Sequence, residues 1–260
     1  MASRPIEFLR NLFERFTKTS SESLSVKRIS TKQFNGSNPA SFYDMEYYEK
    51  GTKSNYGRYD PQSEKIFHPH QEQYYLPLRM KRAQSIVQQY QIKSALDLGC
   101  GKGFFVKAFR LCGVEAYGVD LSEYAIRSCP EDVKYYLYQG DICDLSYFKD
   151  EQFEMVIAIN VLEHIAIPDL YLAIDEAVRV SNCYVMVYVK VADETNLGDK
   201  QTMISSDKGH LSVYPREWWK GELEKRGLRV LWEAKDIYPD GIEGIALIFA
   251  KSLSRTVLPQ

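Results

Sequence analysis

The stretch Leu96-Asp97-Leu98-Gly99-Cys100-Gly101-Lys102-Gly103 decides the fold of this chain. A short apolar strand, Ala95–Leu98, runs here directly into three closely spaced glycines, and an amphipathic helix, Phe104–Leu111, follows them. Glycines permit a tight turn and a close approach of the backbone to a ligand. The helix presents its first backbone N–H groups toward the same place. We therefore predict a strand–turn–helix unit that binds a nucleotide-type ligand.

The spacing of the glycines narrows the choice of ligand. A dinucleotide fingerprint, G-x-G-x-x-G, would place its third glycine where this chain has Phe104. A P-loop needs Ser or Thr after its lysine, but Lys102 is followed by Gly103. Asp97 lies one residue before the end of the strand, where its carboxylate suits a cationic group and repels a pyrophosphate. The turn therefore disfavours a dinucleotide or a nucleoside triphosphate.

Strands and helices alternate regularly beyond Ser94. The expected strands after the first are Ala116–Val119, Tyr135–Tyr138, Met155–Ile159, Tyr184–Val189, Arg229–Glu233 and Ile245–Ala250. The expected long helices are Gln73–Tyr90, Phe104–Leu111, Asp169–Val180 and Pro215–Arg226. This alternation implies right-handed crossovers between mostly parallel strands. We predict an α/β fold: a Rossmann-like, seven-stranded, mostly parallel sheet with helices on both faces, plus an N-terminal helical and irregular cap.

Three further segments with acidic or amide side chains follow the predicted second, third and fourth strands. They are Gly118-Val119-Asp120-Leu121-Ser122, Gln139-Gly140-Asp141-Ile142 and Ile157-Ala158-Ile159-Asn160-Val161-Leu162-Glu163-His164. Together with Leu96–Gly103, they resemble the motifs of class I S-adenosylmethionine-dependent methyltransferases, in particular the small-molecule enzymes of types 11 and 12. The resemblance covers about Ile92 to Ala250 and implies S-adenosylmethionine as the cofactor and S-adenosylhomocysteine as the product.

The resemblance also implies roles for individual residues. Asp120 would accept hydrogen bonds from the ribose hydroxyls, Asp141 would meet the adenine amino group, and Ile142 would pack on the adenine ring. Tyr56, in a polar loop flanked by glycines, is a candidate to close over the cofactor. The complete set of expected cofactor-binding residues is Asp97, Gly99, Gly101, Gly103, Asp120, Leu121, Asp141, Ile142, Asn160 and Tyr56.

The chain divides into three parts by composition. Residues 1–40 are an amphipathic and Ser/Thr-rich appendage, in which Ile6–Phe16 has helical spacing and could support a dimer or lie on a membrane surface. Residues 41–91 form an aromatic-rich cap and a lead-in helix, and residues 92–260 form the methyltransferase domain. Aromatic residues of the cap and the pair Trp218-Trp219 are candidates to wall an acceptor pocket.

Transfer of a methyl group to a hydroxyl requires a base, and histidine has a suitable pKa. His164 follows the fourth strand, and His210 ends a long polar loop, Lys190–Tyr214. We expect one of these two as the catalytic base, with His210 preferred, while Glu163 could position the acceptor. No clear acidic trio indicates a magnesium site, so we expect no metal ligands. A hydroxyl oxygen on a sugar or another small metabolite is the preferred acceptor, and nitrogen or carbon acceptors remain open.

Composition excludes several classes of function. The 260 residues carry a formal net charge of -2, which leaves no global basic field to recruit nucleic acid.

Two local patterns are informative as well. The methyltransferases of adenine and cytosine amino groups share a [DN]-P-P-[YF] motif, whereas Asn160 is followed here by Val161, which makes that class of enzyme unlikely. The number of cysteines is odd, at five, and none has C-x-x-C spacing, which favours reduced thiols and a cytoplasmic location. No apolar run reaches the roughly 20 residues that a membrane-spanning helix needs.

Two other functions remain open at this point. A nucleotide-binding oxidoreductase would share the strand–turn–helix unit, although the glycine spacing opposes it. A non-catalytic member of the same fold would bind the cofactor as a regulatory partner, although Asp97, Asp120 and Asp141 are all retained.

Overall fold

The computed structural model describes seven stretches of the chain, residues 27–28, 37–54, 59–60, 65–66, 68–192, 208–237 and 243–251. Three elements of the sequence analysis lie outside these residues: the amphipathic segment Ile6–Phe16, Tyr56, and residues 193–207 of the loop Lys190–Tyr214. None of the helices in the described stretches is both long enough and apolar enough to cross a membrane.

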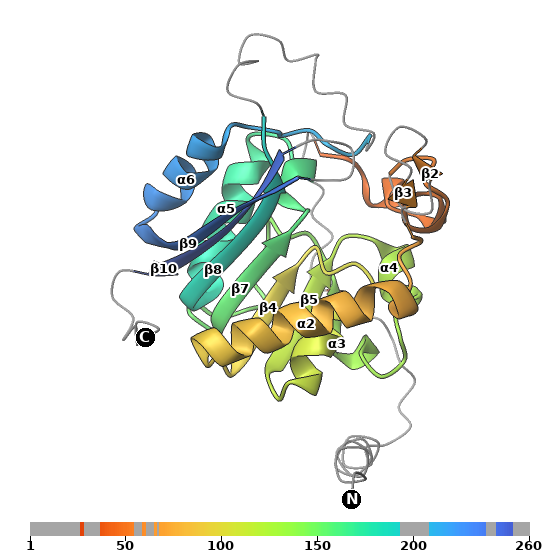
Figure 1. Cartoon of the computed structure of the whole chain (residues 1–260), viewed down its shortest axis with the longest axis horizontal. Coiled ribbons are helices and arrows are strands. Elements are labelled where there is room, and N and C mark those ends of the chain that lie inside the picture. Colours follow the sequence, from red (N-terminus) through yellow and green to blue (C-terminus); the bar gives the residue numbers. More distant parts are fainter. Residues whose placement is uncertain are drawn as a thin grey trace, which may run out of the picture.

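One eight-stranded sheet forms the centre of the molecule, in the order β1-β6-β5-β4-β7-β8-β10-β9 (Figure 1). The strands are β1 (Lys27–Arg28), β4 (Ser94–Leu98), β5 (Glu115–Asp120), β6 (Leu137–Gln139), β7 (Phe153–Ile159), β8 (Ser181–Lys190), β9 (Leu228–Ile237) and β10 (Glu243–Lys251). All neighbours are parallel except β10, which is antiparallel to both β8 and β9. The predicted seven-stranded, mostly parallel sheet is confirmed, and β1 adds an eighth strand from the part of the chain expected to be an appendage.

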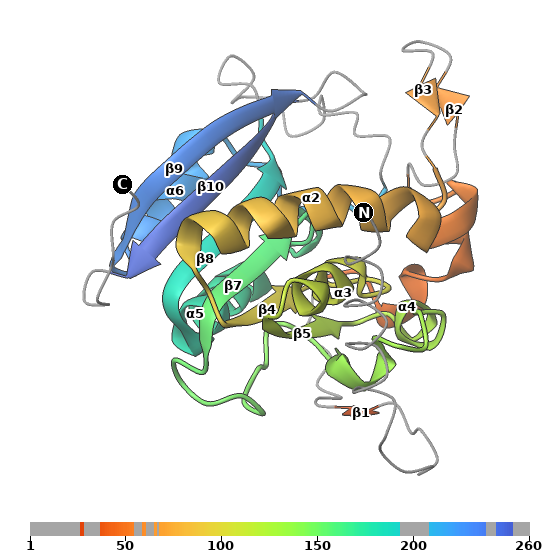
Figure 2. The same ribbon diagram turned by 60° about the horizontal axis from the view of Figure 1, so that its bottom comes forward.

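Helices cover both faces of this sheet. They are α2 (Glu72–Tyr90), α3 (Phe104–Leu111), α4 (Glu123–Arg127), α5 (Asp169–Val180) and α6 (Arg216–Glu224). Helices α2 and α3 pack into one buried apolar cluster, and α5 and α6 pack into another on the opposite face (Figure 2). The strand β7 shows why two layers form, because Val156 and Ala158 point into one cluster while Met155 and Ile157 point into the other.

The boundaries of β6, β9 and β10 differ from the prediction. Tyr135, expected in a strand, lies in a 3-10 turn (Lys134–Tyr136), and β6 begins only at Leu137. The side chain of Tyr135 is half-exposed, so burial does not favour an extended conformation at this residue. The last two strands are longer than predicted because β9 and β10 pair as an antiparallel hairpin over almost their whole length.

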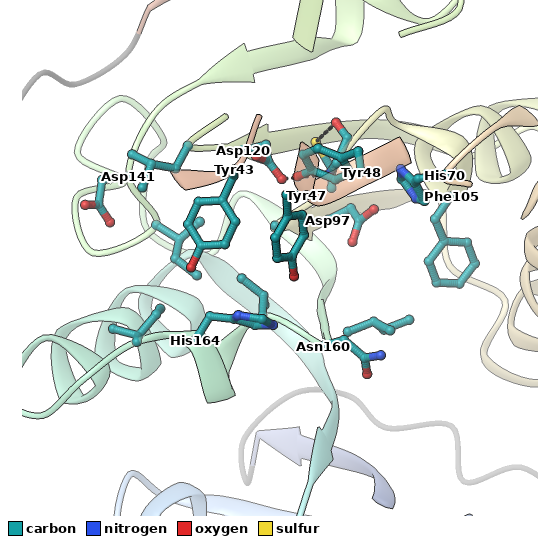
Figure 3. A pocket seen from close by; sticks show the side chains of 18 of the residues that line it. Tyr43, Tyr47, Tyr48, His70, Asp97, Phe105, Asp120, Asp141, Asn160 and His164 are labelled. Atoms are coloured by element: carbon teal, nitrogen blue, oxygen red, sulfur yellow. Dashed lines mark hydrogen bonds between the residues drawn. The ribbon is translucent and has the colours of Figure 1, made fainter. Parts of the chain in front are cut away.

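Residues 37–54, which we call the cap segment, lie over the carboxyl ends of the central strands (Figures 1 and 3). The segment contains a 3-10 turn (Ala40–Phe42) and a short π-helix (Glu46–Lys50). A small hairpin of β2 (Tyr59–Asp60) and β3 (Lys65–Ile66) follows it. An ion pair between the buried Lys102 and the partly buried Glu49 ties the cap segment to the glycine turn.

Candidate functional site

The turn after β4 leaves no room for a side chain at its three glycine positions. Gly99, Gly101 and Gly103 all have a positive φ, of 67°, 55° and 74°. A Cβ atom on Gly101 would lie 2.8 Å from the imidazole Cε1 of His70, and one on Gly99 would overlap the side chain of Val161. The turn therefore combines a backbone conformation that favours glycine with neighbours that approach its backbone closely.

A cavity opens between this turn and the cap segment, at the carboxyl ends of β4, β5, β6 and β7. This is the place where open α/β sheets bind their ligands. Most of the predicted cofactor residues line the cavity, namely Asp97, Gly99, Gly101, Asp120, Leu121, Asp141, Ile142 and Asn160. Gly103 instead caps the start of α3, and Tyr56 lies outside the described residues. Figure 3 shows Asp97 and Asp120 on one side of the cavity, with His164 and Asn160 on the other.

Two buried carboxyl groups stand at the centre of the site. Asp97 and Asp120 are each only 6% exposed. Burial raises the pKa of Asp97 to about 7, against the opposing charge of Arg79 and with a further increase from Asp120. Burial also raises the pKa of Asp120 to about 6. Both carboxyl groups therefore give up their protons more readily when a cationic ligand group enters the cavity.

Asp120 is fixed by the backbone on both of its oxygens. The N–H of Gly101 donates to Oδ2 at 2.7 Å, and the N–H of Ser122 donates to Oδ1 at 2.8 Å. Ser122 in turn caps α4, because its Oγ accepts a hydrogen bond from the N–H of Ala125 at 3.0 Å. The acid at the end of β5 is thus held against the glycine turn at the end of β4.

Asp141 and Asn160 follow the strands that flank β5 and β4 in the sheet. Asp141 comes after β6, and Asn160 comes after β7. The N–H of Cys143 donates to Asp141 Oδ1 at 2.9 Å, and burial raises the pKa of this carboxyl group. Asn160 has a φ of 52°, a left-handed conformation that asparagine tolerates better than most residues. Its backbone N–H donates to the carbonyl of Tyr188 at 2.8 Å, which fixes the turn after β7.

The cap segment supplies the aromatic wall of the cavity. Tyr43, Tyr47 and Tyr48 all line it, as the sequence analysis anticipated for this region. Tyr48 also makes a side-chain hydrogen bond to Asp120. The other aromatic pair expected there lies elsewhere: Trp219 is fully buried in the core, and Trp218 stacks on Tyr214 at 4.1 Å.

Two lining residues, His70 and Arg79, were not among the predicted site residues. His70 is buried between Tyr48, Tyr75 and Phe104, and burial holds its pKa well below the usual value. Its position between Pro69 and α2 offered only a weak signal. Arg79 and Arg82 both lie in α2, and the local sequence does not show which of them reaches the cavity. Arg79 lines the cavity because of the way α2 packs on the domain.

The two candidate bases lie together, but only one reaches the cavity. His164 ends a 3-10 turn (Leu162–His164) after β7 and belongs to the described lining of the cavity, which does not include His210. The two rings contact edge to face, with centroids 4.7 Å apart. Burial, followed by the charges of His164 and Lys190, lowers the pKa of His210 to about 2. At neutral pH His210 is therefore an uncharged imidazole behind His164.

Comparisons with known proteins identify the class of domain and the fold. Residues 96–182 match the family model described as a methyltransferase domain. The range contains the glycine turn, Asp120, Asp141 and the segment that ends in His164. None of the curated protein sequences matches the chain.

Several solved structures have a similar fold. A SAM-dependent methyltransferase from Archaeoglobus fulgidus is 18% identical, with a TM-score of 0.54 over 68% of this chain and 94% of that one. Magnesium protoporphyrin IX methyltransferase from Synechocystis PCC 6803, solved with bound SAH, is 15% identical, with a TM-score of 0.53 over 68% and 84%. The cyclase SpnF is 14% identical, with a TM-score of 0.54 over 66% and 80%. At these identities the structures show a shared fold.

Proposed function

Because residues 96–182 are a class I S-adenosylmethionine-dependent methyltransferase domain with S-adenosylmethionine as cofactor, we propose that the chain methylates a small-molecule acceptor. A hydroxyl oxygen on a sugar or another metabolite is the acceptor that we favour. The observation that carries this proposal is the cavity itself, which joins the buried carboxyl groups of Asp97 and Asp120 to His164 on its other side.

The residues of the cavity fit the cofactor on one side. The cationic methionine part suits Asp97, whose raised pKa reflects a carboxyl group buried without full charge compensation. We assign the ribose hydroxyls to Asp120 with Leu121 beside them, and the adenine to Asp141 and Ile142. The glycine turn allows close approach of the ligand, and Asn160 borders the same space. When bound, S-adenosylmethionine supplies an electrophilic methyl group on a sulfonium.

The acceptor then belongs between the cap segment and His164. Tyr43 and Tyr47 stack edge to face on His164, with ring centroids 5.9 and 6.1 Å away, so they would exclude water and orient an acceptor there. We propose that His164 and His210 together handle the proton of the hydroxyl group. Of the two, His164 is the one placed to touch the acceptor, which moves our preference from His210 to His164.

The proposal extends to partners and location. The acceptor site is a concave pocket with an aromatic wall, which suits a small molecule better than a nucleic acid. All five cysteines are free thiols, which supports a cytoplasmic location. A homodimer formed through the N-terminal residues stays a proposal.

The test is a screen of metabolite extracts with a labelled methyl donor, followed by identification of the labelled product. We expect the wild-type chain to label one small molecule and Asp120→Asn to lose this activity, with affinity for the donor reduced about 100-fold. The matched control is Asp132→Asn, which removes an exposed carboxylate paired with Lys107 and should label as the wild type does. Binding of S-adenosylmethionine without any labelled product would favour the non-catalytic alternative.

A second measurement tests the histidines. We expect His164→Ala to reduce kcat by about 100-fold or more, since proton transfer in the transition state typically contributes that much. Wild-type kcat in both His164→Ala and His210→Ala would contradict the proposed role of the pair.

A further inference from the structure

Three side chains with metal-binding groups meet beside the cavity. One ligand atom each from Glu163, His164 and His210 lies within 4.8 Å of those of the other two. Glu163 is fully buried, His164 is 6% exposed, and His210 is partly buried. We propose that this cluster binds a divalent transition-metal ion of the zinc or manganese type.

The backbone holds the three side chains in this arrangement. Glu163 and His164 are neighbours in the 3-10 turn after β7, so their relative position is set by one short element. The carbonyl of Glu163 accepts hydrogen bonds from the N–H of Leu211 at 2.8 Å and of Ser212 at 2.9 Å. This pair of bonds, which we call the carbonyl clamp, fixes His210 next to Glu163. The third member of the cluster is therefore positioned by main-chain atoms and not by chance contact.

The spacing of the cluster suits an ion after a small adjustment. Bonds of about 2.0–2.2 Å to nitrogen and oxygen place the ligands of one ion roughly 3–4 Å apart. The ligand atoms of the cluster lie within 4.8 Å of one another, so they need to approach by about 1 Å to hold one ion. Such a set of three protein ligands is typical of catalytic metal sites, which keep further positions open.

The chemistry of the ligands selects the ion. Two imidazole nitrogens and one carboxylate oxygen suit zinc, manganese or ferrous iron. Magnesium and calcium prefer oxygen ligands alone, so they fit this cluster less well. Histidine binds a metal through a neutral ring nitrogen, which buried imidazoles readily provide.

The open side of the ion would face the acceptor. His164 belongs both to the cluster and to the lining of the cavity, next to Tyr43 and Tyr47. With the ion bound, His164 and His210 would act as its ligands and not as bases. An acceptor hydroxyl bound to the ion would lose its proton to solvent more easily, because a metal ion lowers the pKa of a bound O–H group. The oxygen lone pair then forms the new bond to the methyl carbon while the carbon–sulfur bond breaks and its electron pair stays on sulfur. This catalytic role rests on the proposed function, whereas binding of the ion rests on the cluster alone.

The experiment measures metal content directly. Untagged full-length chain is stripped with a chelator, dialysed against zinc, manganese or magnesium chloride in separate samples, freed of unbound metal, and analysed by mass spectrometry of the elements. We expect about one zinc or manganese ion per chain and much less magnesium. Glu163→Gln and His210→Gln should each reduce affinity for zinc about tenfold or more, because each removes one of three ligands.

The matched control is His68→Gln, which removes an exposed imidazole that stacks on Tyr74 outside the cluster. This variant should bind zinc as the wild type does. Circular dichroism and binding of S-adenosylhomocysteine establish that each variant is folded. If Glu163→Gln fails to fold because its side chain is buried, His210→Gln and the cobalt-substituted wild type, read by its visible absorption, carry the test.

The possible outcomes distinguish binding of the ion by the cluster from the proposed methyltransferase activity. Uptake of no ion by the wild type, or equal uptake by His210→Gln, would overturn the metal site. A chain that binds the ion but methylates nothing would keep the metal site and contradict the proposed function. Methylation at an unchanged rate by the fully stripped chain would contradict the role of the ion in catalysis.

Discussion

The two sides of the cavity are built in different ways. The donor side takes its residues in chain order from the ends of consecutive parallel strands, from Asp97 to Asn160. The acceptor side joins distant segments: Asn38 Nδ2 donates to the carbonyl of Gly209 at 3.2 Å, across 171 positions of the chain. The N–H of Lys208 likewise donates to the carbonyl of Lys53 at 3.0 Å. The donor side is therefore encoded locally, whereas the acceptor side depends on long-range contacts.

Of the effects that compare the two sides of the cavity, the largest expected one concerns the donor side. Gly101→Ala should weaken binding of S-adenosylhomocysteine about 30-fold, because its Cβ would add left-handed strain and displace His70 from the cavity. Isothermal titration calorimetry measures this affinity. The matched control is Gly113→Ala, where φ is 82° and no described atom lies within 4 Å of the Cβ. The control should lose about 1 kcal/mol of stability and keep its affinity; equal affinities in both variants would contradict a tight donor side.

An intermediate effect is expected from pH. Burial raises the pKa of Asp97 to about 7 and of Asp120 to about 6. Asp97 must therefore lose its proton to bind the cationic amino group of S-adenosylhomocysteine, and Asp120 must lose its proton to accept hydrogen bonds from both ribose hydroxyls. Affinity should increase about tenfold or more from pH 5.5 to 7.5, with proton release seen as a dependence of the binding enthalpy on the buffer. Asp97→Asn should flatten this profile, and Asp132→Asn should not. A flat profile in the wild type would refute the prediction.

The unliganded chain should show the opposite trend in stability. A buried acid with a raised pKa binds its proton more tightly in the folded state than in the unfolded state. Stability from Asp97 and Asp120 is therefore present at low pH and decreases as the pH rises from about 4 to about 7. Thermal unfolding of the wild type and of Asp97→Asn across this range measures the contribution.

The smallest expected effect concerns the acceptor side. Asn38→Ala removes the hydrogen bond to Gly209, so kcat/KM for the acceptor should fall about fivefold while affinity for the donor stays within about twofold of the wild-type value. Asn182→Ala is the control, because its exposed side chain donates to the carbonyl of Glu151 at 3.4 Å and accepts from Sγ of the neighbouring Cys183, away from the cavity. A matching loss of donor affinity in Asn38→Ala would mean that the two sides are not separate.

The same division decides how much the sequence could predict. The strands, the glycine turn and the acids Asp120 and Asp141 follow from local patterns that the structure reproduces closely. His164 and His210 were both found as candidates, but their meeting with Glu163 depends on hydrogen bonds between segments far apart in the chain. His70 and Arg79 reach the cavity only through the packing of α2 and the residues before it, which no local periodicity reveals. Trp219 is an aromatic residue of the kind that often walls a binding pocket, yet it is completely buried in the core.

The carbonyl clamp has a consequence for the divergence of such chains. Its two hydrogen bonds use only the N–H groups of Leu211 and Ser212, so every amino acid except proline can satisfy them. Leu211 is exposed, and mutations there meet little resistance from packing. Evolution could thus vary the surface at Leu211 while the position of His210 stays constant. Natural relatives with different acceptors would then differ at Leu211 and retain a non-proline residue there.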